Sequence, residues 1–163
     1  MNGTSPLENA TAVVTGATGF IGSHLVDYLV GHGCIVHALV RETSDRRWLN
    51  KSNKVKVHTV DLLQSSPINF LQEADYLFHC AGLTKAKTRD DYFSGNVHSC
   101  EILYERCVAI GANLKTIIHL SSLAAAGPSA QGEAAQEKNP CKPVTYYGES
   151  KLAGEKIALK YAS

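Results

Sequence analysis

The chain has 163 residues, of which 44% are hydrophobic and 19% charged, and its net charge is +1. This size and balance predict a single globular domain over residues 1–163, and the lack of a basic stripe argues against nucleic acid as a partner. No apolar run approaches the ~20 residues that span a bilayer, and the N-terminus lacks the basic and apolar regions of a signal peptide. We therefore expect no membrane contact.

The cysteines and histidines are distributed without a ligand pattern. The five cysteines are odd in number and form no C-x-x-C pair. Buried thiols in a reducing compartment, the cytoplasm, are therefore expected. The seven histidines are scattered singly, which argues against a metal site, so no metal ligand is predicted.

Short apolar runs alternate with helical patterns along the chain. Strands are predicted at 12–15, 35–40, 55–60, 76–80 and 116–120, and helices at 20–31, 67–73, 90–110 and from 145 onward. The first helix carries apolar residues at Ile21, Leu25 and Leu29, while residues 123–143 are predicted to form a long loop. This alternation predicts an α/β fold, a doubly wound parallel sheet with strand order 3-2-1-4-5.

Residues 15–22 read Thr-Gly-Ala-Thr-Gly-Phe-Ile-Gly and connect the first strand to the first helix. In this context a glycine-rich turn indicates dinucleotide binding, although the front spacing is one residue wider than usual and a turn without ligand is the alternative. Gly16 permits the tight turn, Gly19 lets a pyrophosphate approach the backbone, and Gly22 lets the helix pack close to the strand. The N–H groups of the helix start then face the anion.

The ends of the second and third strands bear on the choice of cofactor. The second strand ends at Val40-Arg41, where a carboxylate would favour NAD. Because Arg41 can pair with a 2′-phosphate, NADP is slightly favoured over NAD; stacking of Arg41 on adenine, which serves either cofactor, is the alternative. Asp61 is expected to accept a hydrogen bond from the adenine amino group, or else to act as a cap.

Tyr147 and Lys151 are four residues apart at the start of the last helix, so they share a face. Tyrosine alone is a poor base at neutral pH, but a nearby ammonium stabilises its phenolate. Such a tyrosine can exchange a proton with a substrate hydroxyl while hydride moves to or from nicotinamide. Ser122, after the fifth strand, would hydrogen-bond the same oxygen, and Lys151 would also hold the nicotinamide ribose.

With these motifs the chain resembles the extended short-chain dehydrogenase/reductases, the NAD-dependent epimerase/dehydratase group with a Rossmann fold. The matching stretches are 15–22, 61–62, 79–82, 96–97, 120–127 and 147–151. The resemblance implies a catalytic set of Ser122, Tyr147 and Lys151. Together with the residues argued above, the predicted cofactor-binding residues are Gly16, Thr18, Gly19, Phe20, Ile21, Gly22, Arg41, Asp61, Leu62, Ala81, Gly82, Tyr147 and Lys151.

Neighbouring residues compete for two of the catalytic roles. Tyr146 lacks the four-residue spacing to Lys151 that Tyr147 has. The family places its working serine five residues before a loop glycine, which favours Ser122 over Ser121. Asn96 resembles a helix asparagine that the family uses structurally.

The resemblance to this family implies a protein chain of about twice this length. Members of the family add two strands and a smaller substrate-binding domain after the Tyr-x-x-x-Lys helix. We therefore expect a Rossmann fold truncated before the last strands and the substrate domain, and inactive by itself.

The resemblance implies an NAD(P)-dependent sugar-nucleotide epimerase or dehydratase that transiently oxidises a sugar hydroxyl. One alternative is an NADP-dependent reductase of ketones, hydroxysteroids or dihydroflavonols, and another is a non-catalytic dinucleotide-binding module. The expected partner is a small molecule, a nucleotide sugar first. The resemblance also implies a homodimer formed through the long helix 90–110 and the last helix. Tyr92, Tyr104 and Ile157 are assigned equally well to that interface or to the core.

Overall fold

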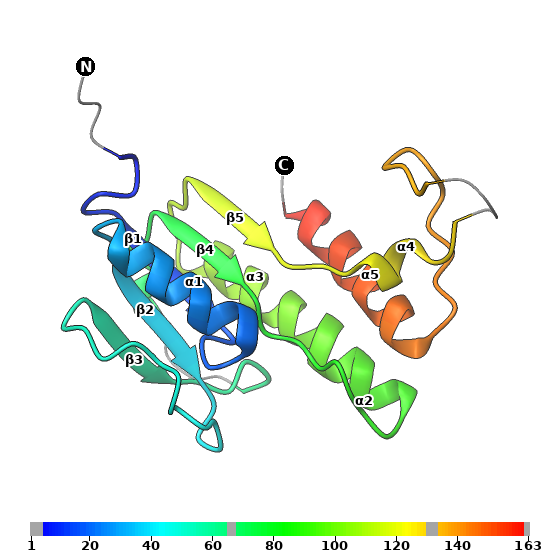
Figure 1. Cartoon of the computed structure of the whole chain (residues 1–163), viewed down its shortest axis with the longest axis horizontal. Coiled ribbons are helices and arrows are strands. Elements are labelled where there is room, and N and C mark those ends of the chain that lie inside the picture. The colour runs from blue at the N-terminus through cyan, green and yellow to red at the C-terminus, as the bar shows by residue number, and fades with distance from the viewer. Residues whose placement is uncertain (1–4, 65–67, 130–133, 162–163) are drawn as a thin grey trace. The chain divides into compact units, whose positions relative to one another are not determined.

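The computed structural model describes residues 5–64, 68–129 and 134–161. The chain forms two compact units, shown in Figure 1. The first, which we call the sheet unit, comprises Met1–Ala81 and Glu105–Leu120. The second, the helical unit, comprises Gly82–Tyr104 and Ser121–Ser163. The sequence-based expectation of a single domain over 1–163 stays a prediction.

The sheet unit contains a parallel sheet whose strand order confirms the predicted one. Its strands are β1 (Thr11–Thr15), β2 (Ile35–Val40), β3 (Val55–Thr59), β4 (Tyr76–His79) and β5 (Thr116–His119). They are arranged β3-β2-β1-β4-β5, and every neighbouring pair is parallel (Figure 1). Each strand agrees with its predicted range to within one residue at either end. The sheet is therefore doubly wound, with its topological switch point between β1 and β4.

Helix α1 (Phe20–Gly31) packs its apolar stripe on one face of this sheet. Val26 and Leu29 are buried with the β1 and β2 side chains of the core, but Ile21 is 53% exposed. The predicted stripe was therefore wrong at its N-terminal end. At this end of the helix Gly22, which has no side chain, packs against the backbone of Gly16 and Ala17, so the buried face runs through Gly22, Val26 and Leu29.

The remaining elements differ from prediction mainly in their regularity. η1 (Asn69–Glu73) is a 3₁₀ helix; the predicted helix start at Pro67 lies outside the described residues. The predicted helix 90–110 is a continuous helical run of α2 (Arg89–Phe93), the π-helical turn η2 (Ser94–His98) and α3 (Ser99–Ala109). A π turn inserts one extra residue per turn, a local irregularity that hydrophobic spacing does not reveal.

The predicted loop 123–143 begins with a short helix, α4 (Leu123–Ala126), which was missed because four residues carry no readable periodicity. The last helix, α5 (Tyr146–Lys160), begins where predicted, and the Thr145 side chain caps it by accepting a hydrogen bond from the Gly148 N–H at 3.0 Å. Among the described residues, no helix combines the length and the apolar character needed to cross a membrane.

Three of the five thiols are buried as expected, and Cys80 is only partly buried. All five cysteines lie among the described residues and none is in a disulfide. Cys34, Cys100 and Cys107 are buried, whereas Cys141 is exposed in the segment before α5. Burial raises the pKa of Cys100 and of Cys107 to about 11, so both remain protonated at neutral pH. Tyr104, 1% exposed, belongs to the core.

Histidines that are scattered in the sequence become neighbours in the sheet unit. The rings of His37 and His58, on β2 and β3, stack with centroids 4.9 Å apart, and Phe70 stacks on His58. Burial, together with the nearby His58 and Lys56, lowers the pKa of His37 to about 4. On β4 and β5, the rings of His79 and His119 lie 5.4 Å apart. The strand register brings these pairs together, so reading the histidines one by one missed them.

The buried imidazole of His37 predicts a loss of stability in acid. The unfolded chain takes up a proton near pH 6.5 and the folded chain near 4, so acidification between these values favours unfolding. The difference amounts to as much as about 3 kcal/mol in the free energy of unfolding. We expect the urea concentration at the denaturation midpoint of the wild-type protein to decrease when the pH is lowered from 6.5 to 4. The decrease should be smaller in His37→Phe. The exposed His32→Asn serves as control; a wild-type slope in His37→Phe would contradict the assignment.

Candidate functional site

The turn between β1 and α1 is built on two close backbone approaches. Gly16 has a φ of +63°, and a Cβ there would lie 2.8 Å from both the Cα and the N of Ala81. At Gly22 a Cβ would overlap the carbonyl oxygen of Gly16. Side chains are therefore excluded at both positions, which lets α1 start directly beside the end of β1.

The N-terminus of α1 is open to an anion. Its N-cap is Gly19, so no side chain caps the helix, and no acidic residue lies in the first turn. A Cβ on Gly19 would meet only the Gly16 carbonyl oxygen, at 3.3 Å. The first-turn amides and the positive end of the helix dipole are thus available to a negatively charged group. Phe20 is 83% exposed beside them.

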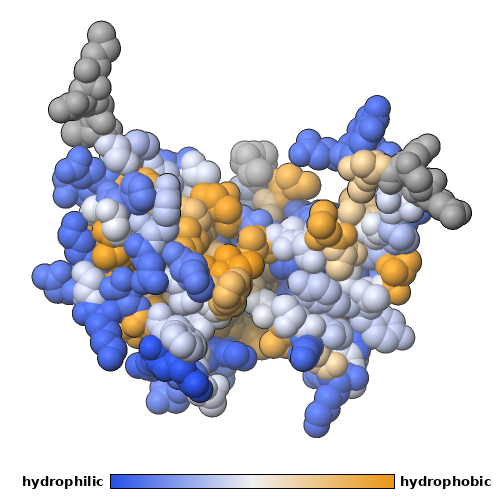
Figure 2. Space-filling view, viewed as in Figure 1, coloured by the Kyte–Doolittle hydropathy of each residue, from blue (hydrophilic) through white to orange (hydrophobic). Residues whose placement is uncertain are grey.

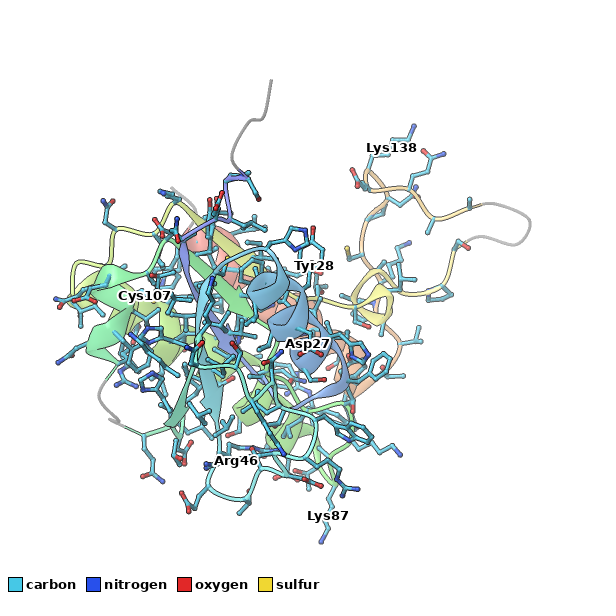
Figure 3. All side chains as sticks on the ribbon, turned by 60° about the vertical axis from the view of Figure 1, so that its left-hand side comes forward. Asp27, Tyr28, Arg46, Lys87, Cys107 and Lys138 are labelled. Carbon is cyan, nitrogen blue, oxygen red and sulfur yellow. The ribbon has the colours of Figure 1, made fainter. Side chains whose placement is uncertain are left out.

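An open hollow of about 480 Å³ adjoins this turn. Its lining residues are Thr18, Phe20, Ser23, His24, Asp27 and Trp48. Asp27 projects from α1 (Figure 3), and its Oδ1 accepts a hydrogen bond from Asn50 Nδ2 at 2.7 Å. Trp48, the only tryptophan of the chain, is 71% exposed and belongs to the loop after β2. Figure 2 shows that apolar side chains reach the surface on the face in view.

A buried polar relay ties the ends of β1 and β4 together. The hydroxyl of Thr15 lies 2.7 Å from Nδ1 of His79, and both residues are 0% exposed. The same hydroxyl oxygen accepts a hydrogen bond from the Ala81 N–H at 3.1 Å. Thr15 and His79 therefore fix the backbone that faces Gly16. Sequence reasoning gave them no role, although polar residues at the ends of two buried strands were a usable signal.

The predicted adenosine contacts follow β2 and β3. Arg41 is exposed. Its backbone N–H donates a hydrogen bond to Ser44 Oγ at 3.0 Å, so the residue lies at the start of a tight turn. The Asp61 side chain accepts a hydrogen bond from the Leu63 backbone N–H at 3.0 Å, in a turn rather than at the first turn of a helix. Leu62 is half-buried beside it.

Two more arginines of the loop after β2 are held by side chains. Arg46 (Figure 3) donates from Nη2 to Thr59 Oγ1 at 3.0 Å. Arg47 pairs with Asp45, and this hydrogen bonding lowers the pKa of the Asp45 carboxyl.

In the helical unit, α5 presents Tyr147 and Lys151 one turn apart. Tyr147 is half-buried and Lys151 is 6% exposed, whereas Tyr146 is 55% exposed. The ring of Tyr92, from α2, lies 6.0 Å from that of Tyr147. A tyrosine and a lysine on one face, with the lysine shielded from water, form a pair suited to proton transfer.

Asn96 joins this face of α5 to the loop that follows β4. The asparagine is 1% exposed and lies in the π turn. Its Oδ1 accepts from the Leu83 N–H at 2.6 Å, and its Nδ2 donates to the Leu83 carbonyl at 3.0 Å and to Ser150 Oγ at 2.9 Å. Ser150 donates in turn to the carbonyl of Tyr147 at 2.8 Å. This network satisfies every group of the buried amide.

Gly82 packs beside the same network. A Cβ on Gly82 would lie 3.0 Å from Asn96 Oδ1 and 3.8 Å from Lys151 Nζ. The helical unit thus brings together three of the residues predicted from sequence, Gly82, Tyr147 and Lys151.

The two adjacent serines after β5 have different partners. The hydroxyl oxygen of Ser122 caps α4 by accepting a hydrogen bond from the Ala124 N–H at 3.2 Å. The hydroxyl of Ser121 donates instead to the carboxylate of Glu155 on α5. Sequence reasoning singled out both serines but not Glu155, which lies four residues beyond Lys151.

Residues 12–163 match the model of the NAD dependent epimerase/dehydratase family. The chain belongs to this family. It is 35% identical over 126 residues to the ceramide reductase of Caulobacter vibrioides, covering 77% of this chain and 38% of that protein. It is 30% identical over 150 residues to the sterol demethylase protein B of Methylococcus capsulatus, with coverage of 89% and 45%.

Among solved structures, the UDP-glucuronic acid 4-epimerase of Bacillus cereus in complex with NAD superposes with a TM-score of 0.80. The identity is 26%, and the match covers 93% of this chain and 52% of that one. The chain therefore spans about half the length of these relatives, or less.

The family uses NAD(P), and the start of α1 fits the diphosphate of such a cofactor. An uncapped helix without a first-turn carboxylate offers amides to an anion and no like charge against it.

A methyl group at Gly19 tests this fit. Gly19→Ala leaves the backbone unstrained, since φ is −74°, but places a methyl over the amides of the helix start. We expect the Kd for NADH or NADPH to rise about 10-fold or more, with stability changed by less than about 1 kcal/mol. The fluorescence of Trp48 provides the titration signal. Gly31→Ala, where a Cβ would meet nothing within 4 Å, is the matched control; equal affinities in both variants would place the diphosphate elsewhere.

Proposed function

We propose that this chain provides the cofactor-binding and proton-transfer parts of an NAD(P)-dependent enzyme that transiently oxidises a hydroxyl of a nucleotide sugar, leading to epimerisation or dehydration. The observation that carries the proposal is the position of Tyr147 one helical turn before Lys151 on α5, where the lysine is 6% exposed. Membership of the family and the likeness to a nucleotide-sugar epimerase of known structure support the substrate class.

In this proposal each unit contributes cofactor contacts through the residues predicted from sequence. In the sheet unit, Gly16, Thr18, Gly19, Phe20, Ile21 and Gly22 hold the diphosphate, while Arg41, Asp61, Leu62 and Ala81 contact the adenosine part. In the helical unit, Gly82 and Lys151 contact the nicotinamide ribose. The nearness of Gly82 to Lys151 Nζ supports this assignment.

The proton chemistry rests on Tyr147. Its phenolate takes the proton of the substrate hydroxyl, and the Lys151 ammonium stabilises the negative charge. Ser122 donates a hydrogen bond to the same substrate oxygen. That role is supported by the separate engagement of Ser121, whose hydroxyl donates to Glu155. The bound nicotinamide supplies the complementary chemistry, accepting or returning a hydride.

A net reductase of ketone or sterol-like substrates is the second candidate. Arg41 directly follows β2, at the position where a carboxylate would favour NAD, and its guanidinium favours NADP; the chain is also 35% identical to a ceramide reductase over 126 residues. Its substrate would be reduced and released, whereas an epimerase regenerates its cofactor.

Nicotinamide absorbance, measured on the full-length protein, distinguishes these functions. Turnover of UDP- or dTDP-sugars without net cofactor consumption supports the epimerase or dehydratase. Consumption of NADPH with a ketone panel, and none with nucleotide sugars, selects the reductase. Tight cofactor binding by calorimetry without turnover of either panel indicates a non-catalytic module. The predicted homodimer remains open to measurement by light scattering.

Substitution of Tyr147 tests the proton-transfer role. Tyr147→Phe keeps the ring but removes the hydroxyl, so kcat should fall by about 10²- to 10⁴-fold while cofactor affinity stays within about threefold. Tyr146→Phe, the neighbouring and more exposed tyrosine, should retain wild-type kcat. Loss of activity in Tyr146→Phe alone would reverse the assignment.

Substitution of Arg41 tests the choice of cofactor. If its guanidinium pairs with the 2′-phosphate, Arg41→Ala should raise the Kd for NADP about 10-fold and leave that for NAD unchanged, because one charge-assisted contact is lost. Arg47→Ala is the control in the same loop, since Arg47 is held by Asp45. Parallel calorimetric titrations with both cofactors measure the effect, and a wild-type preference for NAD would refute the role of Arg41.

A further inference from the structure

Helix α5 carries a third polar side chain in line with Tyr147 and Lys151. Glu155 follows Lys151 by four residues, as Lys151 follows Tyr147, so the three lie along one helical face. Glu155 is half-buried, and its Oε1 accepts the hydrogen bond donated by Ser121 Oγ. A hydrogen bond to a carboxylate is stronger than one between neutral groups.

A second contact fastens the same segment to the start of α5. Gly148 is buried against α4, and a Cβ at this position would overlap the carbonyl oxygen of Ala124. The segment from Ser121 to Ala124 is thus fixed to α5 at both ends, through Glu155 at one end and through Gly148 at the other. Ser122 lies between these two points.

We propose that Glu155 is a positioning residue that, by holding Ser121, sets the location of the Ser122 hydroxyl relative to Tyr147 on the same helix. This inference rests on the proposed function, in which Ser122 and Tyr147 act on one substrate oxygen. Neither Ser121 nor Glu155 needs to touch the substrate. The hydrogen bond between Ser121 and Glu155 keeps the turn that carries Ser122 at a fixed position along the axis of α5.

The structure gives a physical reason for this division of labour between adjacent serines. Successive residues in extended backbone point in opposite directions, so one hydroxyl can anchor while the other faces away. Ser122 itself has an extended backbone, with φ −155° and ψ 147°. Among the described residues, the Ser122 side chain has one hydrogen bond, which it accepts from the Ala124 N–H. This local cap does not fix the turn against α5. Loss of the Ser121–Glu155 bond would therefore release the N-terminal end of the segment.

The test compares variants that remove the bond with one that preserves it. Ser121→Ala and Glu155→Ala each delete one partner, whereas Glu155→Gln keeps an acceptor oxygen at the same place. Glu105→Ala, an exposed helical glutamate, is the matched control. In the full-length protein, amide hydrogen exchange of the peptide covering residues 121–127 is measured by mass spectrometry, together with kcat and the KM for cofactor.

We expect exchange in residues 121–127 to accelerate about 10-fold in Ser121→Ala and Glu155→Ala, and to stay at the wild-type rate in Glu155→Gln and Glu105→Ala. In the same two variants kcat should fall about 10- to 100-fold with an unchanged KM for cofactor, because a displaced hydroxyl impairs the chemical step alone. The double variant should lose no more than either single one.

Wild-type exchange in the two alanine variants would overturn the inference. So would accelerated exchange without loss of kcat, or failure of glutamine to restore both. If wild-type protein turns over no substrate of either panel, the proposed function fails, and the exchange rates still decide whether Glu155 holds the turn.

Discussion

The architecture of the sheet unit depends on a backbone approach that no side chain would permit. Gly16 faces Ala81 at the ends of β1 and β4, and Gly22 faces the carbonyl of Gly16. Because of these contacts, α1 begins immediately beside the sheet, with amides that its own backbone cannot satisfy. The absence of a cap and of a first-turn carboxylate leaves that end of the helix suited to an anion. The hydrogen bonds of the Thr15 hydroxyl with His79 and with the Ala81 N–H stabilise this close approach of β1 and β4 from inside the core.

The helical unit solves a related problem with buried polar side chains. A buried asparagine is costly unless its amide is fully bonded, and the contacts of Asn96 to Leu83 and Ser150 meet that condition. The π turn supplies the irregularity that directs Asn96 inward from an otherwise regular helix. As a result, the loop carrying Gly82 and the helix carrying Tyr147 and Lys151 are held by one network. A rigid frame of this kind is what proton transfer between fixed groups requires.

The chain belongs to the NAD dependent epimerase/dehydratase family and spans about half the length of its relatives. The parts that it contains are the turn before α1 and the Asn96 network described above. Epimerases and reductases resemble the chain comparably, at 26% to 35% identity. The proton chemistry that we propose for Tyr147 and Lys151 is common to the epimerase, dehydratase and reductase functions.

The sequence by itself determined the order of strands, the glycine turn and the placement of Tyr147 and Lys151 one turn apart on α5, because each depends on local spacing and on the handedness of β-α-β crossovers. It did not determine contacts between residues far apart in the chain. The stacking of His37 on His58, the relay from Thr15 to His79 and the bond from Ser121 to Glu155 arise only from strand register and helix packing. The inward position of Asn96 depends on a π turn, and the buried face of α1 on a missing side chain at Gly22. Tertiary structure decided these features because their energy comes from partners that no local pattern specifies.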